Sequence, residues 1–237
     1  MSCLAAPIAR TLVSDQVFAR LIEPIFSGAY APGEKLPTQR ALAADLEVNM
    51  ASVREAVKRL EQLRLVEVRQ GDAMRVRDWR AEGGLDVVVH LLVAAGGLDR
   101  PTFLAVLEAR RLMLAEAARL AAQQRTEAQA KRLEGLAKSF AAAEAEPAAA
   151  QRIDLAFMTE LVEASHNVVF VLILNTVRRL YLDNAHLFGA LVADGGELAP
   201  LYRRAAAAVA GSEPTRAANA VARLAGEQER RLTEALG

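Results

Sequence analysis

Ser52 and Arg54 are side chains that could bind nucleic acid, since both lie in the first turns of a segment with helical apolar spacing, residues 49–63. An arginine guanidinium can donate two parallel hydrogen bonds to a guanine edge or grip a phosphate, and a serine hydroxyl can donate to either group. Most surface arginines are simply solvated. The elements that surround these two residues therefore have to decide between the two interpretations.

The elements around Ser52 and Arg54 follow a definite order. Periodicity predicts helices at residues 10–27, 38–45 and 49–63, followed by short strands at 65–69 and 73–77. Thr38 and Asn49 are suited to cap the second and third helices, because their short side chains can accept a hydrogen bond from a free backbone N–H. A helix, a helix-turn-helix and a β-hairpin in this order indicate a winged helix.

The remainder of the chain is predicted to be helical. Apolar residues make up 53% of the 237 residues and aromatic residues only 5%, and alanine and leucine favour helix. The predicted helices span residues 85–95, 100–123, 126–144, 149–166, 168–190, 196–211 and 213–235. We therefore expect a mainly α protein with three parts: a winged helix-turn-helix at 1–78, a linker at 79–84 and an all-helical bundle at 85–237.

Specific residues in both parts resemble the GntR family of transcription regulators, in particular its FadR subgroup. The N-terminal match consists of Gly28-x-x-x-Pro32-Gly33-Glu34-Lys35-Leu36-Pro37-x-x-Arg40-x-Leu42-Ala43 and Val53-Arg54-Glu55-Ala56-Val57-x-x-Leu60-Glu61. The C-terminal match consists of Glu108-Ala109-Arg110-Arg111, Asp154-x-x-Phe157 and Ala164-Ser165-His166-Asn167. The resemblance implies a DNA-binding domain joined to a helical domain that binds an effector.

The resemblance also implies which residues contact double-stranded operator DNA. These are Arg40, Asn49, Met50, Ser52 and Arg54, with Gln70 and Gly71 at the tip of the hairpin. The chain departs from the family pattern at Glu47, where a turn glycine is usual, at Met50 and at Asp72. Met50 cannot hydrogen-bond a base, and Asp72 places a negative charge on the hairpin tip.

Many related effector domains hold a divalent metal with one aspartate and three histidines. Asp154 matches the aspartate, but Met158, Tyr202 and Leu224 occupy the positions of the histidines. Those side chains cannot replace neutral imidazoles for a divalent ion. We therefore expect no metal and no other cofactor.

Without a metal, the effector would be held by the bundle itself, as in the fatty-acid-responsive branch of the subgroup. The polar candidates for ligand binding are Arg110, Asp154, Asn175, Arg178, Tyr181 and Tyr202. Arg110 is the best suited, because its guanidinium matches a carboxylate or phosphate, so the effector is expected to be a small carboxylate or an acyl-CoA-like metabolite. Two alternatives stay open: the tyrosines are ordinary core residues, or Phe157, Met158 and Leu224 fill the pocket.

Composition and motifs narrow the remaining classes of function. The chain has one cysteine, Cys3, no phosphate-binding glycine loop and no nucleophile elbow, so we expect neither a disulfide framework nor an enzyme. No apolar run is long enough to span a membrane, so a cytoplasmic protein is expected. The family resemblance implies a homodimer that acts as a repressor. The alternative is a helical scaffold protein whose winged helix has lost specific DNA binding, since the net charge is zero.

Overall fold

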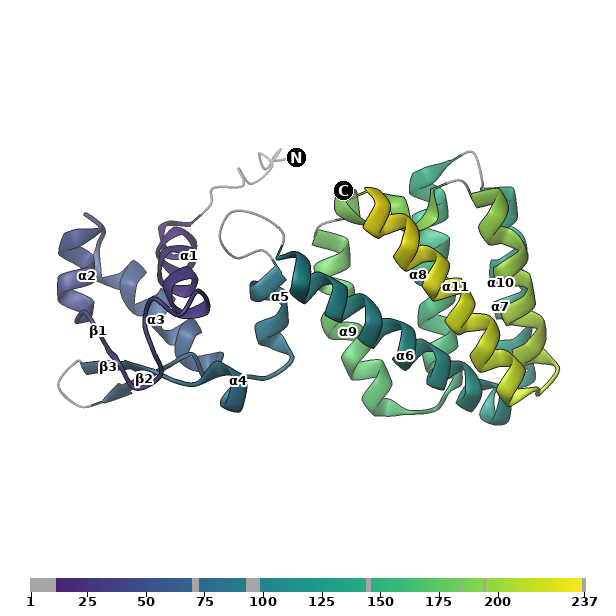
Figure 1. Ribbon diagram of the computed structural model, residues 1–237, viewed down its shortest axis with the longest axis horizontal. Helices are drawn as coiled ribbons and strands as arrows, with labels where there is room; N and C mark the ends of the chain where they lie inside the picture. Colours follow the sequence, from purple (N-terminus) through teal and green to yellow (C-terminus); the bar gives the residue numbers. More distant parts are fainter. Residues whose placement is uncertain are drawn as a thin grey trace, which may run out of the picture. The chain divides into compact units, whose positions relative to one another are not determined.

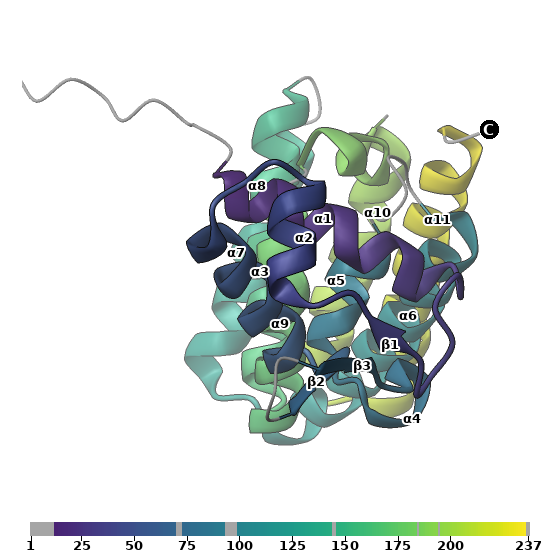
Figure 2. The same cartoon turned by 90° about the vertical axis from the view of Figure 1, so that its left-hand side faces the viewer.

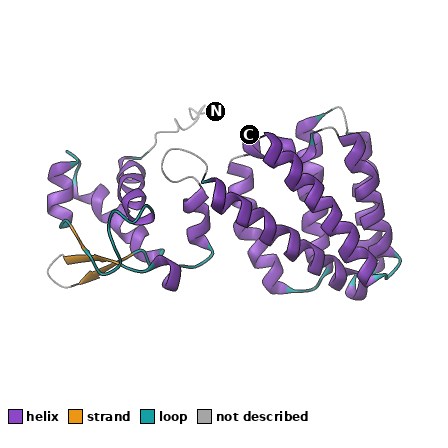
Figure 3. Ribbon diagram, in the orientation of Figure 1, coloured by secondary structure: helices purple, strands orange, loops and turns teal. Residues whose placement is uncertain are grey.

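The computed structural model describes residues 12–69, 73–92, 99–143, 146–183, 185–193 and 195–235. The chain divides into two compact units, Met1–Arg100 and Pro101–Gly237. All strands of the described residues lie in the first unit, and the second is built from helices (Figure 3). The predicted class, mainly α with a winged helix-turn-helix and a helical bundle, is confirmed.

The first unit contains the predicted helices and strands, with small additions. In chain order its elements are α1 (Val13–Phe26), β1 (Lys35–Leu36), α2 (Gln39–Asp45), α3 (Met50–Gln62), β2 (Val66–Arg69), β3 (Ala73–Val76), α4 (Trp79–Glu82) and α5 (Asp86–Leu92) (Figure 1). The residues expected to form a linker, 79–84, begin with the short helix α4. The sequence did not predict β1, because two residues show no alternation.

The two caps predicted for the helix-turn-helix are confirmed. The Thr38 hydroxyl accepts a hydrogen bond from the backbone N–H of Ala41, and the Asn49 side-chain oxygen accepts one from that of Ser52 at 2.9 Å. Each bond satisfies a backbone donor that the first helical turn leaves free. These caps fix the residues at which α2 and α3 begin.

A three-stranded antiparallel sheet, ordered β1-β3-β2, closes the apolar core of the first unit (Figure 2). Val66 pairs with Val76, and Leu36 pairs with Met74, whose side chain is fully buried. These residues pack in one cluster with Leu60 of α3 and Ile22 of α1. The sheet and α1 therefore hold α3 from its apolar side, which leaves its opposite face exposed.

The second unit is a helical bundle that contains one helix break the sequence did not predict. Its elements are α6 (Arg100–Gln124), α7 (Glu127–Ala142), α8 (Pro147–Ala164), α9 (Val168–Asp183), the 3-10 helix η2 (Ala185–Val192), α10 (Gly195–Ala210) and α11 (Pro214–Ala235). The single helix predicted at 168–190 was therefore wrong, since α9 ends at Asp183 and η2 follows. Helix α10 packs against α7 and α11, and α8 packs against α7, α9 and η2.

The turn between α2 and α3 contains a strained residue, and this strain can be tested. Glu47 has a φ of 52°, in the left-handed region that favours glycine. Glu47→Gly removes about 1–2 kcal/mol of strain and adds about 0.5–1 kcal/mol of chain entropy to be lost on folding. We expect a net gain of about 0.5–1 kcal/mol in the free energy of unfolding, measured by urea denaturation.

Glu47→Ala is the matched control, because alanine removes the same carboxylate but keeps the strain. It should leave the stability near that of the unchanged protein. Equal stabilisation by alanine and glycine would show that the charge of Glu47, and not its backbone conformation, opposes folding.

Helix α5 is attached to the winged helix through His90. The imidazole ring lies edge-on to the Phe18 ring of α1, with 5.0 Å between the ring centroids, and the Arg59 guanidinium lies 4.2 Å from the centroid of Phe18. Burial and the positive charge of Arg59 lower the pKa of His90, although Asp86 opposes the shift. The neutral imidazole is therefore the form that the folded unit favours.

This contact predicts a loss of stability in mild acid. Because the pKa of His90 is lower in the folded state, the unfolded chain binds a proton more readily as the pH falls through the ordinary histidine pKa, and unfolding becomes easier. The melting temperature of the unchanged protein should therefore fall as the pH is lowered from 7.5 to 5.5. The melting temperature of the His90→Gln variant should fall less over the same interval. An identical decrease in both proteins would contradict this role of His90.

Candidate functional site

The exposed surface of α2 and α3 holds the residues expected to bind DNA. Arg40, in the first turn of α2, and Arg54, on α3, are both exposed, and neither guanidinium has an ion-pair partner among the described residues. Met50 and Ser52 are half-buried at the start of α3. The surface therefore presents two cations and a hydroxyl beside the first turn of a capped helix.

Two details limit this surface. The Asn49 side-chain oxygen is already used by the cap, so it has less capacity to bind a base. Arg59, on the same helix, forms an ion pair with Asp15 of α1 and stacks on Phe18, so it fixes the position of α3. The predicted contacts at Gln70 and Gly71 lie outside the described residues.

The helical unit contains a buried polar network, contributed by four helices. Asp154 of α8 is buried, and its Oδ1 accepts hydrogen bonds from the Tyr202 hydroxyl of α10 at 2.5 Å and from Nε2 of Gln228 of α11 at 2.8 Å. The Gln228 Oε1 in turn accepts a hydrogen bond from the Arg110 guanidinium of α6 at 2.8 Å. We call these four residues the Asp154 network.

Electrostatics explain why the Asp154 network is stable. A buried carboxylate is costly unless donors surround it, and here a phenol, an amide and, through the amide, a guanidinium provide them. Burial and the charge of Asp154 raise the pKa of Tyr202 well above its ordinary value, so the hydroxyl stays protonated and donates a hydrogen bond to the carboxylate.

Aromatic rings enclose the Asp154 network. The ring of Phe140 stacks on that of Tyr202 at 4.0 Å, and Phe157 meets it edge-on at 5.0 Å. Tyr181 of α9 packs on Phe188 of η2, and its buried hydroxyl lies near the Gln151 side chain without a hydrogen bond of normal geometry. Burial and the charge of Asp154 also raise the pKa of Tyr181.

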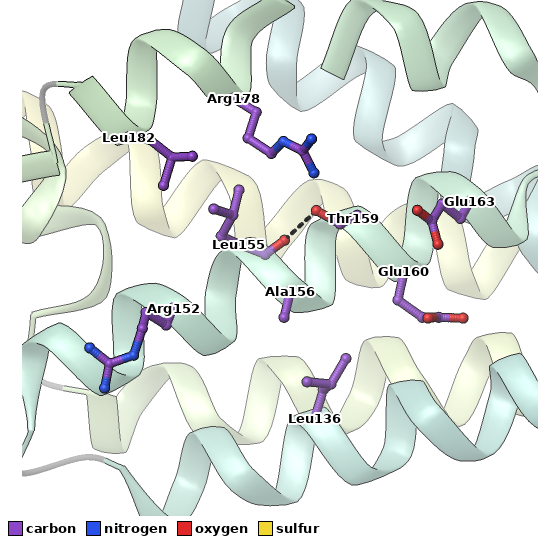
Figure 4. Close-up of a pocket in the computed structure, with 9 residues that line it drawn as sticks. All are labelled: Leu136, Arg152, Leu155, Ala156, Thr159, Glu160, Glu163, Arg178 and Leu182. Atoms are coloured by element: carbon purple, nitrogen blue, oxygen red, sulfur yellow. Dashed lines mark hydrogen bonds between the residues drawn. The ribbon is translucent and has the colours of Figure 1, made fainter. Parts of the chain in front are cut away.

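The structure therefore brings together four of the six residues predicted to bind the effector, and it places the other two elsewhere. Arg110, Asp154 and Tyr202 belong to the Asp154 network. Tyr181 lies close enough for the charge of Asp154 to raise the pKa of its hydroxyl. Asn175 and Arg178 are exposed on α9, where Arg178 lines a groove of about 460 Å³ between α7, α8 and α9 (Figure 4).

Sequence reasoning missed Gln228, although a signal was present. Leu224, the expected fourth position of the site, is fully buried on α11, and Gln228 follows it by one helical turn on the same face. A buried glutamine in an otherwise apolar stripe needs polar partners, and Asp154 and Arg110 provide them.

The residues around Asp154 do not fit a divalent ion. Met158 and Leu224 are buried at two of the expected ligand positions, and Tyr202 at the third donates to the carboxylate that an ion would need. Among the described residues, no three histidine, cysteine, aspartate or glutamate side chains come together. The side chains around Asp154 therefore do not form a ligand set for a divalent metal ion.

Comparison with known proteins agrees with both halves of this description. Residues 13–76 match the bacterial regulatory proteins of the gntR family, and residues 105–226 match the FCD domain. No described helix is long and apolar enough to cross a membrane.

Individual relatives cover most of the chain. The chain is 34% identical over 214 residues to the HTH-type transcriptional regulator Mce2R of Mycobacterium tuberculosis, covering 90% of this chain and 89% of the relative. It is 32% identical over 159 residues to the regulator LutR of Bacillus subtilis, covering 67% and 71%. The fold is similar to that of Escherichia coli McbR/YncC, with a TM-score of 0.53 at 18% identity over 96% of this chain and all (100%) of that one. The chain therefore belongs to the GntR family of bacterial transcription regulators, with a helical FCD domain after its helix-turn-helix.

Proposed function

We propose that this regulator is a cytoplasmic homodimeric repressor that leaves its operator when a small carboxylate or acyl-CoA-like metabolite binds the helical unit. The observation that supports DNA binding is the exposure of Arg40 and Arg54 beside the capped start of α3. Two such helices related by a two-fold axis would contact a palindromic site. Some of the curated relatives, such as NanR of Cronobacter sakazakii, are named as repressors.

The Asp154 network supports the choice of effector. Arg110 is half-buried, and its guanidinium donates to a neutral amide oxygen, an acceptor weaker than a carboxylate. An anionic group that reached Arg110 would replace Gln228 as its acceptor and form the stronger pair. The buried Tyr181 hydroxyl, which makes no hydrogen bond of normal geometry with the described residues, would then offer a second contact to the same ligand.

Release from DNA follows from linkage between the two sites. A ligand shifts DNA affinity only by its differential affinity for the two conformations of the protein, typically about 1–3 kcal/mol. Gln228 lies on α11 and Arg110 on α6, so breaking their hydrogen bond changes a contact between the first and last helices of the bundle. That change is a direct route from ligand binding to helix movement.

The DNA-binding half of the proposal can be tested on DNA from upstream of the protein's own gene. Arg54→Ala should weaken specific binding by about 1–3 kcal/mol, roughly 5- to 150-fold, because it removes a base or phosphate contact. Fluorescence anisotropy at several salt concentrations measures this, and phosphate contacts make the affinity fall as salt rises.

Arg203→Ala is the matched control, since Arg203 is equally exposed but lies on α10 of the helical unit. It should bind the operator as the unchanged protein does. If no DNA selected from the whole genome binds more tightly than random sequence, the chain is instead the scaffold protein considered as the alternative.

The effector half is tested with a panel of mono- and dicarboxylates and an acyl-CoA. A panel member that binds should raise the melting temperature and weaken operator binding, and Arg110→Ala should abolish both effects while DNA binding without ligand is retained. Arg203→Ala should respond as the unchanged protein does. A full response in Arg110→Ala would place the effector away from the Asp154 network.

A further inference from the structure

Helix α9 packs on α8 and η2 with one side, but it leaves apolar side chains exposed on its other side. Its sequence is VVFVLILNTVRRLYLD, and yet none of its side chains that the structure describes is fully buried. Val168, Leu172 and Leu182 are 68%, 60% and 57% exposed. Its neighbour α8 buries eight residues, so the exposure belongs to α9 in particular.

Seven described residues of α9 are exposed: Val168, Val169, Leu172, Asn175, Arg178, Arg179 and Leu182. Five of them, Val168, Leu172, Asn175, Arg178 and Leu182, lie on one face and are separated by three or four residues. Counted from Asn175, they stand at −7, −3, 0, +3 and +7. A face with this spacing matches itself when a second α9 is laid against it in the opposite direction.

We propose that α9 pairs antiparallel with the α9 of a second copy of this chain, with the two-fold axis passing beside Asn175. This deepens the proposed function, because it rests on the homodimer and assigns it a surface. In this pairing Val168 meets Leu182 of the partner subunit, so apolar ends cover one another. Asn175 meets the partner's Asn175, and two amides complement each other because each has both a donor and an acceptor.

Charge complementarity favours the same occupant. The partner's Arg178 comes opposite Leu172, near the start of α9, and Glu163 lies at the end of α8 just before the turn that leads into α9. Glu163 is exposed and has no ion-pair partner among the described residues, whereas Glu160 beside it is already paired with Arg132. Glu163, Arg178 and Leu182 line the same groove, so the acid and the base border one surface (Figure 4).

A central polar residue in an apolar helix seam is known to set the register of paired helices. Asn175 has this position, and Val168 and Leu182 stand at equal distances on either side. The arrangement satisfies the requirement of an isologous interface, in which every contact between the two copies occurs twice, once on each side of the two-fold axis.

The test is a disulfide across the two-fold axis in the full chain. In a Cys3→Ser background, Asn175→Cys should form a disulfide-linked dimer on mild oxidation, because two residues beside the axis of closely packed helices come within the 4.4–6.8 Å Cα separation that a disulfide needs. Asn219→Cys is the matched control, an equally exposed asparagine on α11, and it should remain uncrosslinked.

Solution measurements complete the test. Analytical ultracentrifugation measures the dissociation constant of the dimer. This constant should be at least tenfold higher for Leu172→Glu than for Leu112→Glu, which changes a leucine of similar exposure on α6. Arg178→Glu should also weaken the dimer, and adding Glu163→Arg should restore it.

Each contrary result has its own meaning. If Leu172→Glu remains a dimer and Asn175→Cys forms no crosslink, the α9 pairing is overturned but the homodimer stays in place. A chain that is monomeric at every concentration overturns both the pairing and the homodimer, whereas DNA binding by that monomer would keep the regulator itself.

Discussion

The helical unit depends on one constraint, which is that the carboxylate of Asp154 lies in the interior of a bundle. An ion removed from water must be supplied with donors, and here α10 and α11 provide them directly, while α6 contributes through the hydrogen bond from Arg110 to Gln228. The tyrosine of α10, the glutamine of α11 and the arginine of α6 are thereby held at defined positions relative to α8. Apolar contacts have little directionality, whereas the hydrogen bonds of the Asp154 network need defined distances and angles between these helices.

In the winged helix, the packing fixes α3 in position and leaves its outer face exposed. Caps define where α2 and α3 begin, and the apolar cluster fixes the inner face of α3. Arg59 adds an ion pair and a cation–π contact to α1, so one arginine of α3 is used for internal support. The strained backbone at Glu47 lies within the turn that sets the angle between α2 and α3.

Much of this architecture could be predicted from sequence, because local signals determine it. Helical periodicity, the caps at Thr38 and Asn49 and the alternation in the hairpin all depend on neighbouring residues. The break between α9 and η2 and the partners of Asp154 could not be predicted in this way, because they depend on residues brought together from distant helices. Gln228 is the clearest case, since its role becomes visible only when α6, α8 and α11 are assembled.

The chemistry of the Asp154 network also bears on how the helical unit is assembled. A central site made of a carboxylate, a phenol, an amide and a guanidinium is complete as soon as the chain has folded. Each of these four groups comes from a different helix, so the polar centre forms only when α6, α8, α10 and α11 are all in place. Secondary structure alone therefore does not create this centre, which depends on the tertiary assembly of the bundle.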